Sequence, residues 1–235
     1  MKTDLPYDHV LRLQQFSAPV VRQVEAWNAA AKKAGTPCRV FCPPDAVDQM
    51  VRAETRAEIR FGERFLELVR DTPDLTWLVP TTTPELVLGW MARVELCDVA
   101  ETLPQLWLGV AAVLQEEVDD RVPELMDLPA DRRFLWLDGV GQRLNLAPHL
   151  PHAFNREPTC PWCESCIPDT AGSVRWKSTT EDDHGPFLDW VVLRQSEGCT
   201  FAAVAAVAAQ CVKAETPLYV TRCSDPELRK FPTPR

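Results

Sequence analysis

Short runs of apolar residues, each bounded by turn-forming residues, recur along most of the chain. The runs are continuously apolar instead of alternating, which is typical of strands that are buried on both faces of a parallel sheet. We predict six strands from them, at residues 39–42, 75–80, 106–111, 133–139, 189–194 and 217–222.

Helical patterns separate the predicted strands. Apolar residues recur at three- and four-residue spacing in five segments, residues 18–35, 45–71, 83–94, 115–128 and 201–214. We expect Pro123 to kink or divide the fourth of these helices. The repeated alternation of strand and helix predicts an α/β fold with a parallel sheet of about six strands, open or curled into a partial TIM-like barrel.

One segment breaks this alternation. Residues 147–187 are rich in proline and polar residues, and a loop of this length is usually functional. We interpret it as an irregular insertion within a single α/β domain that spans residues 1–235. It carries the sequence PTCPWCESCIPDT, in which Cys160, Cys163 and Cys166 are each separated by two residues.

These three cysteines have several interpretations. Zinc takes four cysteine or histidine ligands, and a Cys-x-x-Cys pair is a common part of such a site. The candidate ligands are Cys160, Cys163, Cys166 and His152, with His149 or His184 as other choices for the fourth. An iron–sulfur cluster is less favoured because a fourth cysteine is missing nearby. A redox pair and a loop of unligated thiols remain open.

Composition and charge narrow the classes of function. Of the 235 residues 46% are hydrophobic, which is enough for a large core. The formal net charge of -9, without a basic cluster, disfavours nucleic acid as a partner and leaves a basic protein possible. No apolar run approaches the roughly 20 residues that span a bilayer, so we expect no membrane contact. The N-terminal segment lacks the apolar core of a secretion signal, so we expect a cytoplasmic protein whose nine cysteines are thiols or ligands.

Several stretches follow one another with the order and spacing of a known family. They are VVRQVEAWNAAAKKAGTPCRVFC (20–42), LVRDTPDLTWLVPTTTPE (68–85), LPQLWLGVAAVLQEEVDDRVPELMDLPADRRFLW (103–136), LDWVVLRQSEG (188–198) and AAQCVKAETPLYV (208–220). Through them the chain resembles the phage- and prophage-encoded three-Cys-motif family, whose members are radical-SAM-like proteins of unclear function. The resemblance covers most of residues 20–222 and implies an incomplete TIM-like barrel.

The chain departs from this family where chemistry would be expected. No cysteine precedes Cys38, so the family's N-terminal cluster loop is absent and SAM is not an expected cofactor. The family's Thr-Lys-Arg-Pro after the second strand is Thr81-Thr82-Thr83-Pro84 here, and its Glu-Pro after the fourth is Asp138-Gly139. Barrel enzymes place their active sites at these strand ends. The resemblance therefore implies a catalytically degenerate member that keeps the scaffold.

Two functions follow from these observations. The first is a phage- or mobile-element-encoded binding or scaffold subunit, which binds another protein such as a family relative or a host factor. The second is a metal-binding enzyme or redox protein that uses the insertion cysteines with zinc or an iron–sulfur cluster. If a small-molecule pocket survives at the strand ends, its polar residues are Thr81, Asp138, Glu197 and Arg222.

Overall fold

The computed structural model describes residues 7–12, 17–94, 103–151, 187–195 and 199–221. Within these ranges the chain forms seven strands, six α-helices and two single-turn 3₁₀-helices. The strands are β1 (His9–Val10), β2 (Cys38–Phe41), β3 (Leu75–Thr81), β4 (Leu106–Ala112), β5 (Arg133–Asp138), β6 (Trp190–Arg194) and β7 (Leu218–Thr221). The helices are α1 (Ala18–Ala34), α2 (Pro44–Val51), α3 (Arg56–Asp71), η1 (Pro84–Leu86), α4 (Val87–Arg93), α6 (Gln115–Met126), η2 (Ala147–His149) and α7 (Phe201–Lys213).

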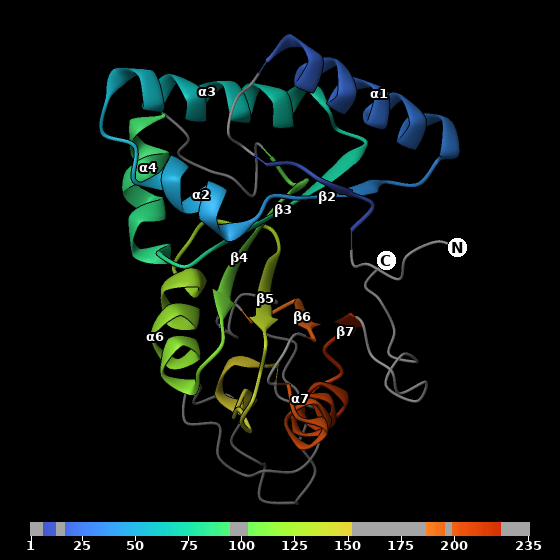
Figure 1. Ribbon diagram of the computed structural model, residues 1–235, viewed down its shortest axis with the longest axis vertical. Helices are drawn as coiled ribbons and strands as arrows, with labels where there is room; N and C mark the ends of the chain where they lie inside the picture. The colour runs from blue at the N-terminus through green and yellow to red at the C-terminus, as the bar shows by residue number, and fades with distance from the viewer. Residues whose placement is uncertain (1–6, 13–16, 95–102, 152–186, 196–198, 222–235) are drawn as a thin grey trace, which may run out of the picture.

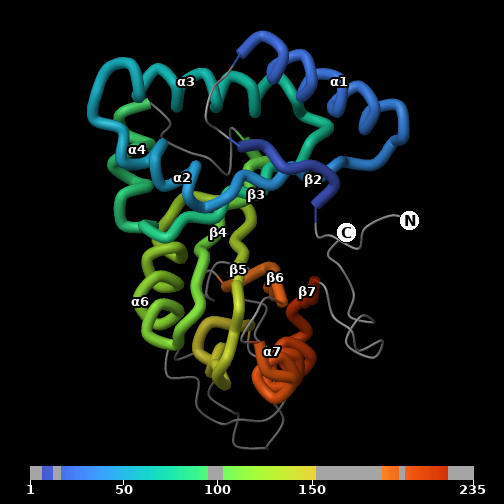
Figure 2. Tube along the Cα trace, viewed as in Figure 1, coloured from blue at the N-terminus to red at the C-terminus, as the bar shows by residue number. Residues whose placement is uncertain are grey.

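All seven strands are parallel and form one sheet in the order β1-β2-β3-β4-β5-β6-β7. Each strand therefore lies beside its predecessor in the chain, and the sheet curls into a half-barrel (Figures 1 and 2). Among the described strands β1 and β7 are the two edges, because they pair with β2 and β6 alone. The α/β fold with a partial TIM-like barrel is thus confirmed.

The helices pack on the convex face of the curled sheet (Figure 1). A large apolar core fills the space between helices and sheet, and fully buried side chains such as Val24, Phe65, Trp77 and Val118 contribute to it. A second, smaller cluster lies on the opposite, concave face. The strands are therefore buried on both faces, as their continuously apolar sequences predict.

The six predicted strands match β2 to β7 to within one or two residues at each end. The two-residue strand β1 is an addition, and its pairing with β2 attaches residues 9–10 to the sheet. The prediction of one helix over 45–71 is wrong, because α2 ends at Val51 and α3 begins at Arg56. Thr55 starts α3 with a capping box, in which its hydroxyl accepts from the Glu58 N–H and the Glu58 carboxylate accepts from the Thr55 N–H.

The structure also tests the predicted end of the first helix and the predicted effect of Pro123. Helix α1 ends at Ala34 and is followed by Gly35, whose left-handed φ of 66° is a conformation that glycine adopts without strain. Pro123 does not divide α6, which runs through it to Met126. Among the described residues no helix combines the length and the apolar character that crossing a membrane requires.

Candidate functional site

The carboxyl ends of the strands are the edge of the half-barrel where polar groups were predicted. Thr81, the last residue of β3, is only 2% exposed. Its hydroxyl donates to Asp48 of α2 at 2.5 Å, and the same carboxylate accepts from the backbone N–H of Thr82 at 2.9 Å and from its hydroxyl at 2.5 Å. Asp48 thus joins α2 to the end of β3, and its bonding capacity is largely used within the protein.

Asp138, the last residue of β5, is paired with Arg194, the last residue of β6. The two residues are opposite each other in the register of these strands, and Arg194 Nη1 lies 3.2 Å from Asp138 Oδ2. Both side chains are substantially solvent-exposed, at 37% and 44%. The pair neutralises the charge at this point of the edge, and an exposed ion pair of this kind adds little stability.

The predicted strand-end pocket has two described members, Thr81 and Asp138. Thr81 follows Trp77 and Val79 on the helix-covered face, where it meets Asp48. Asp138 follows Phe134 and Trp136 on the concave face, because side chains alternate along a strand. The structure therefore does not bring these two residues together. Glu197 and Arg222 lie outside the described residues, so their share in a pocket stays a prediction.

The concave face is lined with aromatic rings. Its buried cluster consists of Phe41, Leu78, Ala111, Phe134, Trp136, Trp190 and Val192. Tyr7, Phe41 and Trp136 form a stack, with ring centroids 4.9 Å apart in the first pair and 4.3 Å apart in the second. Rings that pack on one another at these distances fill the interior as a core does.

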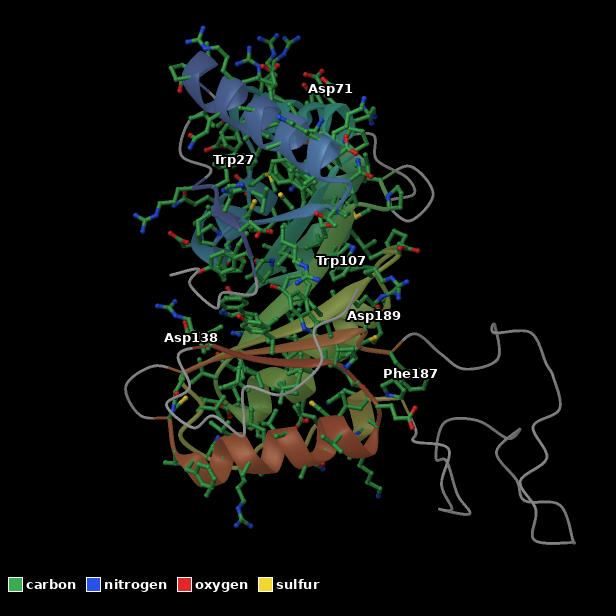
Figure 3. The ribbon with its side chains drawn as sticks, turned by 90° about the vertical axis from the view of Figure 1, so that its right-hand side faces the viewer. Trp27, Asp71, Trp107, Asp138, Phe187 and Asp189 are labelled. Atoms are coloured by element: carbon green, nitrogen blue, oxygen red, sulfur yellow. The ribbon has the colours of Figure 1, made fainter. Side chains whose placement is uncertain are left out.

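Trp190 is the centre of this concave cluster and is fully buried. Trp107 meets it edge-on at 5.9 Å between ring centroids, and the Arg39 guanidinium carbon lies 5.2 Å above its ring (Figure 3 shows Trp107 on the sheet). The Trp190 Nε1 atom has no hydrogen-bond partner within the described part of the chain. The Arg39 cation attracts the indole ring, but a guanidinium only donates and supplies no acceptor for this N–H.

Large apolar side chains are exposed where the chain leaves β3 and β4. Leu86 and Leu88 are 36% and 49% exposed, and Val113 and Leu114 are 40% and 43% exposed. We call these four residues the apolar rim. Helix η1, which carries Leu86, packs against α6, which begins directly after Leu114. Phe201, at the start of α7 beyond the end of β6, is 64% exposed on the same edge of the sheet.

Glu117 fixes one half of the apolar rim. Its carboxylate accepts from the backbone N–H of Val113 at 2.7 Å and of Leu114 at 3.0 Å, and it pairs with Arg121 at 3.0 Å. Partial burial opposes ionisation, but the two N–H bonds and the Arg121 charge outweigh it and lower the pKa of Glu117. The turn that presents Val113 and Leu114 to solvent is therefore held rigidly.

Exposed acids lie close to the apolar rim in the chain. Glu85 precedes Leu86, and Glu116, Asp119 and Asp120 lie on the first two turns of α6. In barrel enzymes this edge presents acids, bases and cofactor ligands around a cavity. Here it presents exposed apolar side chains within an acidic border. Such a combination is typical of a surface that binds another macromolecule.

The proposed metal ligands Cys160, Cys163, Cys166 and His152 all lie outside the described residues, so the metal site stays a prediction. In the described ranges no group of three or more His, Cys, Asp or Glu side chains is arranged to hold a metal ion. Of the candidate ligands, the structure describes His149, whose Nε2 lies 3.5 Å from Asp119 Oδ1. Burial raises the pKa of the Cys211 thiol to about 12 and that of Cys42 further, so neither is a reactive thiolate.

Sequence reasoning missed Asp48, Glu117 and the aromatic lining of the concave face. Asp48 lies inside a helical pattern, and nothing local distinguishes it from a solvent-exposed acid. Glu117 did have a signal, since an acid in the first turn of a helix, three residues after the residue that precedes it, is typical of a helix N-terminus. The aromatic lining is visible as large residues at alternate strand positions, but the pattern does not say which face is concave.

Comparison with known proteins gives one match. A family model described as "Protein of unknown function (DUF5131)" matches residues 6–223. No curated protein and no solved structure matches the chain.

Proposed function

The chain belongs to the DUF5131 family. We propose that it is a binding subunit, whose half-barrel binds another protein through the apolar rim. The observation that carries this proposal is the exposure of Leu88 and Leu114 beside the carboxyl ends of β3 and β4. Large apolar side chains in a fixed turn at a functional edge favour a contact surface.

The state of the neighbouring polar groups supports the same role. Asp48 binds Thr81 and Thr82, and Asp138 pairs with Arg194. Groups that are committed to internal partners are poor general acids or bases, because catalysis requires them to reach a substrate. The concave face is the inner side of the half-barrel, and stacked rings fill it as part of the core.

The charge around the rim indicates the chemistry of the partner. Glu85, Glu116, Asp119 and Asp120 border the apolar residues, and the whole chain carries a formal charge of -9. A complementary surface combines apolar side chains with lysine or arginine, since opposite potentials steer and orient association. The partner that we propose is therefore a protein with a basic, amphipathic segment.

The origin of the scaffold belongs to the same proposal. The resemblance to radical-SAM-like, phage-encoded three-Cys-motif proteins, together with Thr81-Thr82-Thr83-Pro84 and Asp138-Gly139 in place of the family's strand-end residues, supports a degenerate relative. In such a relative the packed strands persist while the catalytic edge changes. The partner would then be a catalytically competent family relative or a host factor.

The test uses the full chain with substitutions in the apolar rim. Leu88→Ser and Leu114→Ser remove exposed apolar area, so each should leave the melting temperature nearly unchanged. Val212→Ser is the matched control, because Val212 is 59% exposed at the far end of α7. Affinity capture from the organism that encodes the chain, followed by mass spectrometry, compares the four proteins.

A specific result supports the proposal. The wild type and Val212→Ser should recover the same basic protein, and both rim variants should lose it. Binding of the purified pair should weaken steeply as salt is raised, because the contact is partly electrostatic. The apolar rim is not the binding site if the rim variants recover the same protein in equal amounts, or if the affinity of the purified pair does not depend on salt.

A further inference from the structure

Exposed charged side chains form one face of helix α3, which lies on the outside of the molecule at the end away from α7 (Figure 1). The residues of this face, which we call the charged face, are Arg56, Arg60, Glu63, Arg64, Glu67 and Asp71. The opposite side of α3, with Phe65 and Val69, is buried in the core. The apolar rim lies on other elements, so the charged face has no part in the proposed function.

The signs of the charges are sorted along the helix. Arginines occupy the N-terminal half of the face and acids occupy the C-terminal half, with Glu63 and Arg64 adjacent in the middle. Residues four apart are neighbours on a helix, and like charges at this spacing repel each other. Arg60 has an arginine four residues away on either side, and Glu67 has an acid four residues away on either side. A solvated helix face is instead stabilised by opposite charges at this spacing.

The charged face has no ion-pair partners within the chain. Opposite charges three residues apart, such as Arg60 and Glu63, are near enough along a helix to pair. In the part of the chain that the structure describes, however, no side chain of the charged face takes part in an ion pair. Every one of these side chains is exposed, so its charge is accessible to another molecule.

The sequence of charges is complementary to itself when the helix is turned end to end. Two α3 helices can lie antiparallel, with a two-fold axis through the middle of the charged face. Arg56 then stands opposite Asp71 of the second copy, and Arg60 stands opposite Glu67 of the second copy. The two-fold axis repeats each of these opposite-charge pairs, so arginine meets acid along the whole length of the helix. The like-charge repulsion within each copy is offset by attraction between the copies.

We propose that the charged face of α3 binds a second copy of this chain in an antiparallel, two-fold contact. Helix α3 contains four arginines and four acids, so this surface is neutral within a chain of formal charge -9. Two copies of an acidic protein therefore repel each other least when they approach through such a surface. A nucleic acid fits less well, because the acids of the same face repel its phosphates.

The nature of the contact determines its strength. Ion pairs between exposed side chains are individually weak and are screened by salt. The dimer should therefore form at low ionic strength and dissociate as salt is raised. Sedimentation equilibrium of the full chain at about 0.02 M and about 0.5 M salt tests this, because the screening length falls from roughly 20 Å to roughly 4 Å between them. We expect the dissociation constant of the dimer to rise at least about tenfold.

Charge reversal tests the arrangement of the two copies. Arg60→Glu sets acid against acid at two symmetric positions, and Glu67→Arg sets arginine against arginine there, so each variant alone should be monomeric at low salt. An equal mixture of the two variants should form a heterodimer. In the mixture the introduced acid faces the introduced arginine, and the native Glu67 of the first variant faces the native Arg60 of the second. Arg143→Glu, at an exposed arginine after β5, is the matched control and should form dimers as the wild type does.

Thermal unfolding shows that each variant is folded, and the melting temperature should change little because the substituted side chains are exposed. A wild-type chain that is monomeric at low salt overturns the proposal. A dimer that persists in Arg60→Glu or in Glu67→Arg also overturns it, as does a mixture of these two variants that remains monomeric.

Discussion

The Glu117 carboxylate holds the backbone of Leu114, which donates its N–H to Glu117 at 3.0 Å while its side chain remains 43% exposed. One hydrogen-bonded acid thus fixes the position of an apolar contact residue. A rigid turn of this kind loses little conformational entropy when a partner binds.

This bond predicts a pH dependence. The pKa of Glu117 is lowered in the folded chain from its usual value of 4.5, so its contribution to stability is fully present above that value. The contribution should be lost as the pH falls from 4.5 through the lower folded value. Glu117→Gln should lower the free energy of unfolding by about 1 kcal/mol at pH 7. It should also reduce the further loss of stability below pH 4.5.

Chemical denaturation between pH 3 and pH 7 measures the free energy of unfolding for this comparison. Glu116→Gln is the control, since Glu116 is an exposed acid in the same helical turn. If Glu117→Gln and Glu116→Gln give the same dependence of stability on pH, the hydrogen bonds from Val113 and Leu114 to Glu117 do not stabilise the fold in this way.

We predict that substitution of Asp48 destabilises the fold. Asp48→Ala removes the acceptor for the Thr81 hydroxyl and for the Thr82 N–H and hydroxyl. Because these donors are partly buried, the change should cost about 2 kcal/mol in the free energy of unfolding. Asp45→Ala, on the exposed face of α2, should cost less than half as much. Similar losses in urea denaturation would contradict a special role for Asp48.

We predict that any side chain at position 109 would clash with the residues of the concave face. A Cβ atom at this position would lie 2.6 Å from the Phe134 ring, which is fully buried. Gly109→Ala should therefore destabilise the chain by about 1–3 kcal/mol. Gly89→Ala meets no atom closer than 3.5 Å in α4 and should instead stabilise it by about 0.5–1 kcal/mol. Thermal unfolding of both variants checks the opposite signs.

The buried cysteines predict slow thiol chemistry. Burial raises the pKa of Cys211 to about 12, and both Cys42 and Cys211 are fully buried. Neither should react with iodoacetamide at pH 8 until the chain unfolds, because the thiolate is the reactive form. Peptide mapping after labelling, with and without denaturant, measures this. Fast labelling of either residue in the native chain would contradict the packing of Cys211 in α7 or of Cys42 directly after β2.

The predicted metal site has a direct measurement. A zinc site made by Cys160, Cys163, Cys166 and His152 requires about one zinc ion per chain in protein purified without chelator. Cys163→Ser should then remove most of the zinc, whereas Cys199→Ser should retain it. Elemental analysis that finds neither zinc nor iron in the wild type would end the metal hypothesis.

The strands could be predicted because their information is local. Runs such as 106–111 are apolar throughout and end at turn residues, and six of the seven described strands follow from that pattern. Strand β1 could not, because two residues carry no pattern and pair only through β2. The break between α2 and α3 carried a visible signal, since Thr55 and Glu58 have the spacing of a capping box.

The candidate site was less predictable because it depends on which face a side chain occupies. Thr81 and Asp138 both end a strand, yet one faces the helices and the other the concave surface. Alternation along a strand relates Thr81 to Trp77, but it cannot identify the inside of a curved sheet. The apolar rim was missed because exposed leucines in a short connection look, in sequence alone, like buried ones.

The order of the strands in the sheet has a consequence for synthesis. Since every strand lies beside the one that precedes it in the chain, a nascent polypeptide can add each strand and its covering helix to those already formed, without waiting for the C-terminus. The half-barrel can therefore grow on the ribosome one β-α unit at a time. The pairing of β5 with β6 closes the longest connection in the sheet, because Phe134 pairs with Trp190, so it should be the slowest step of this assembly.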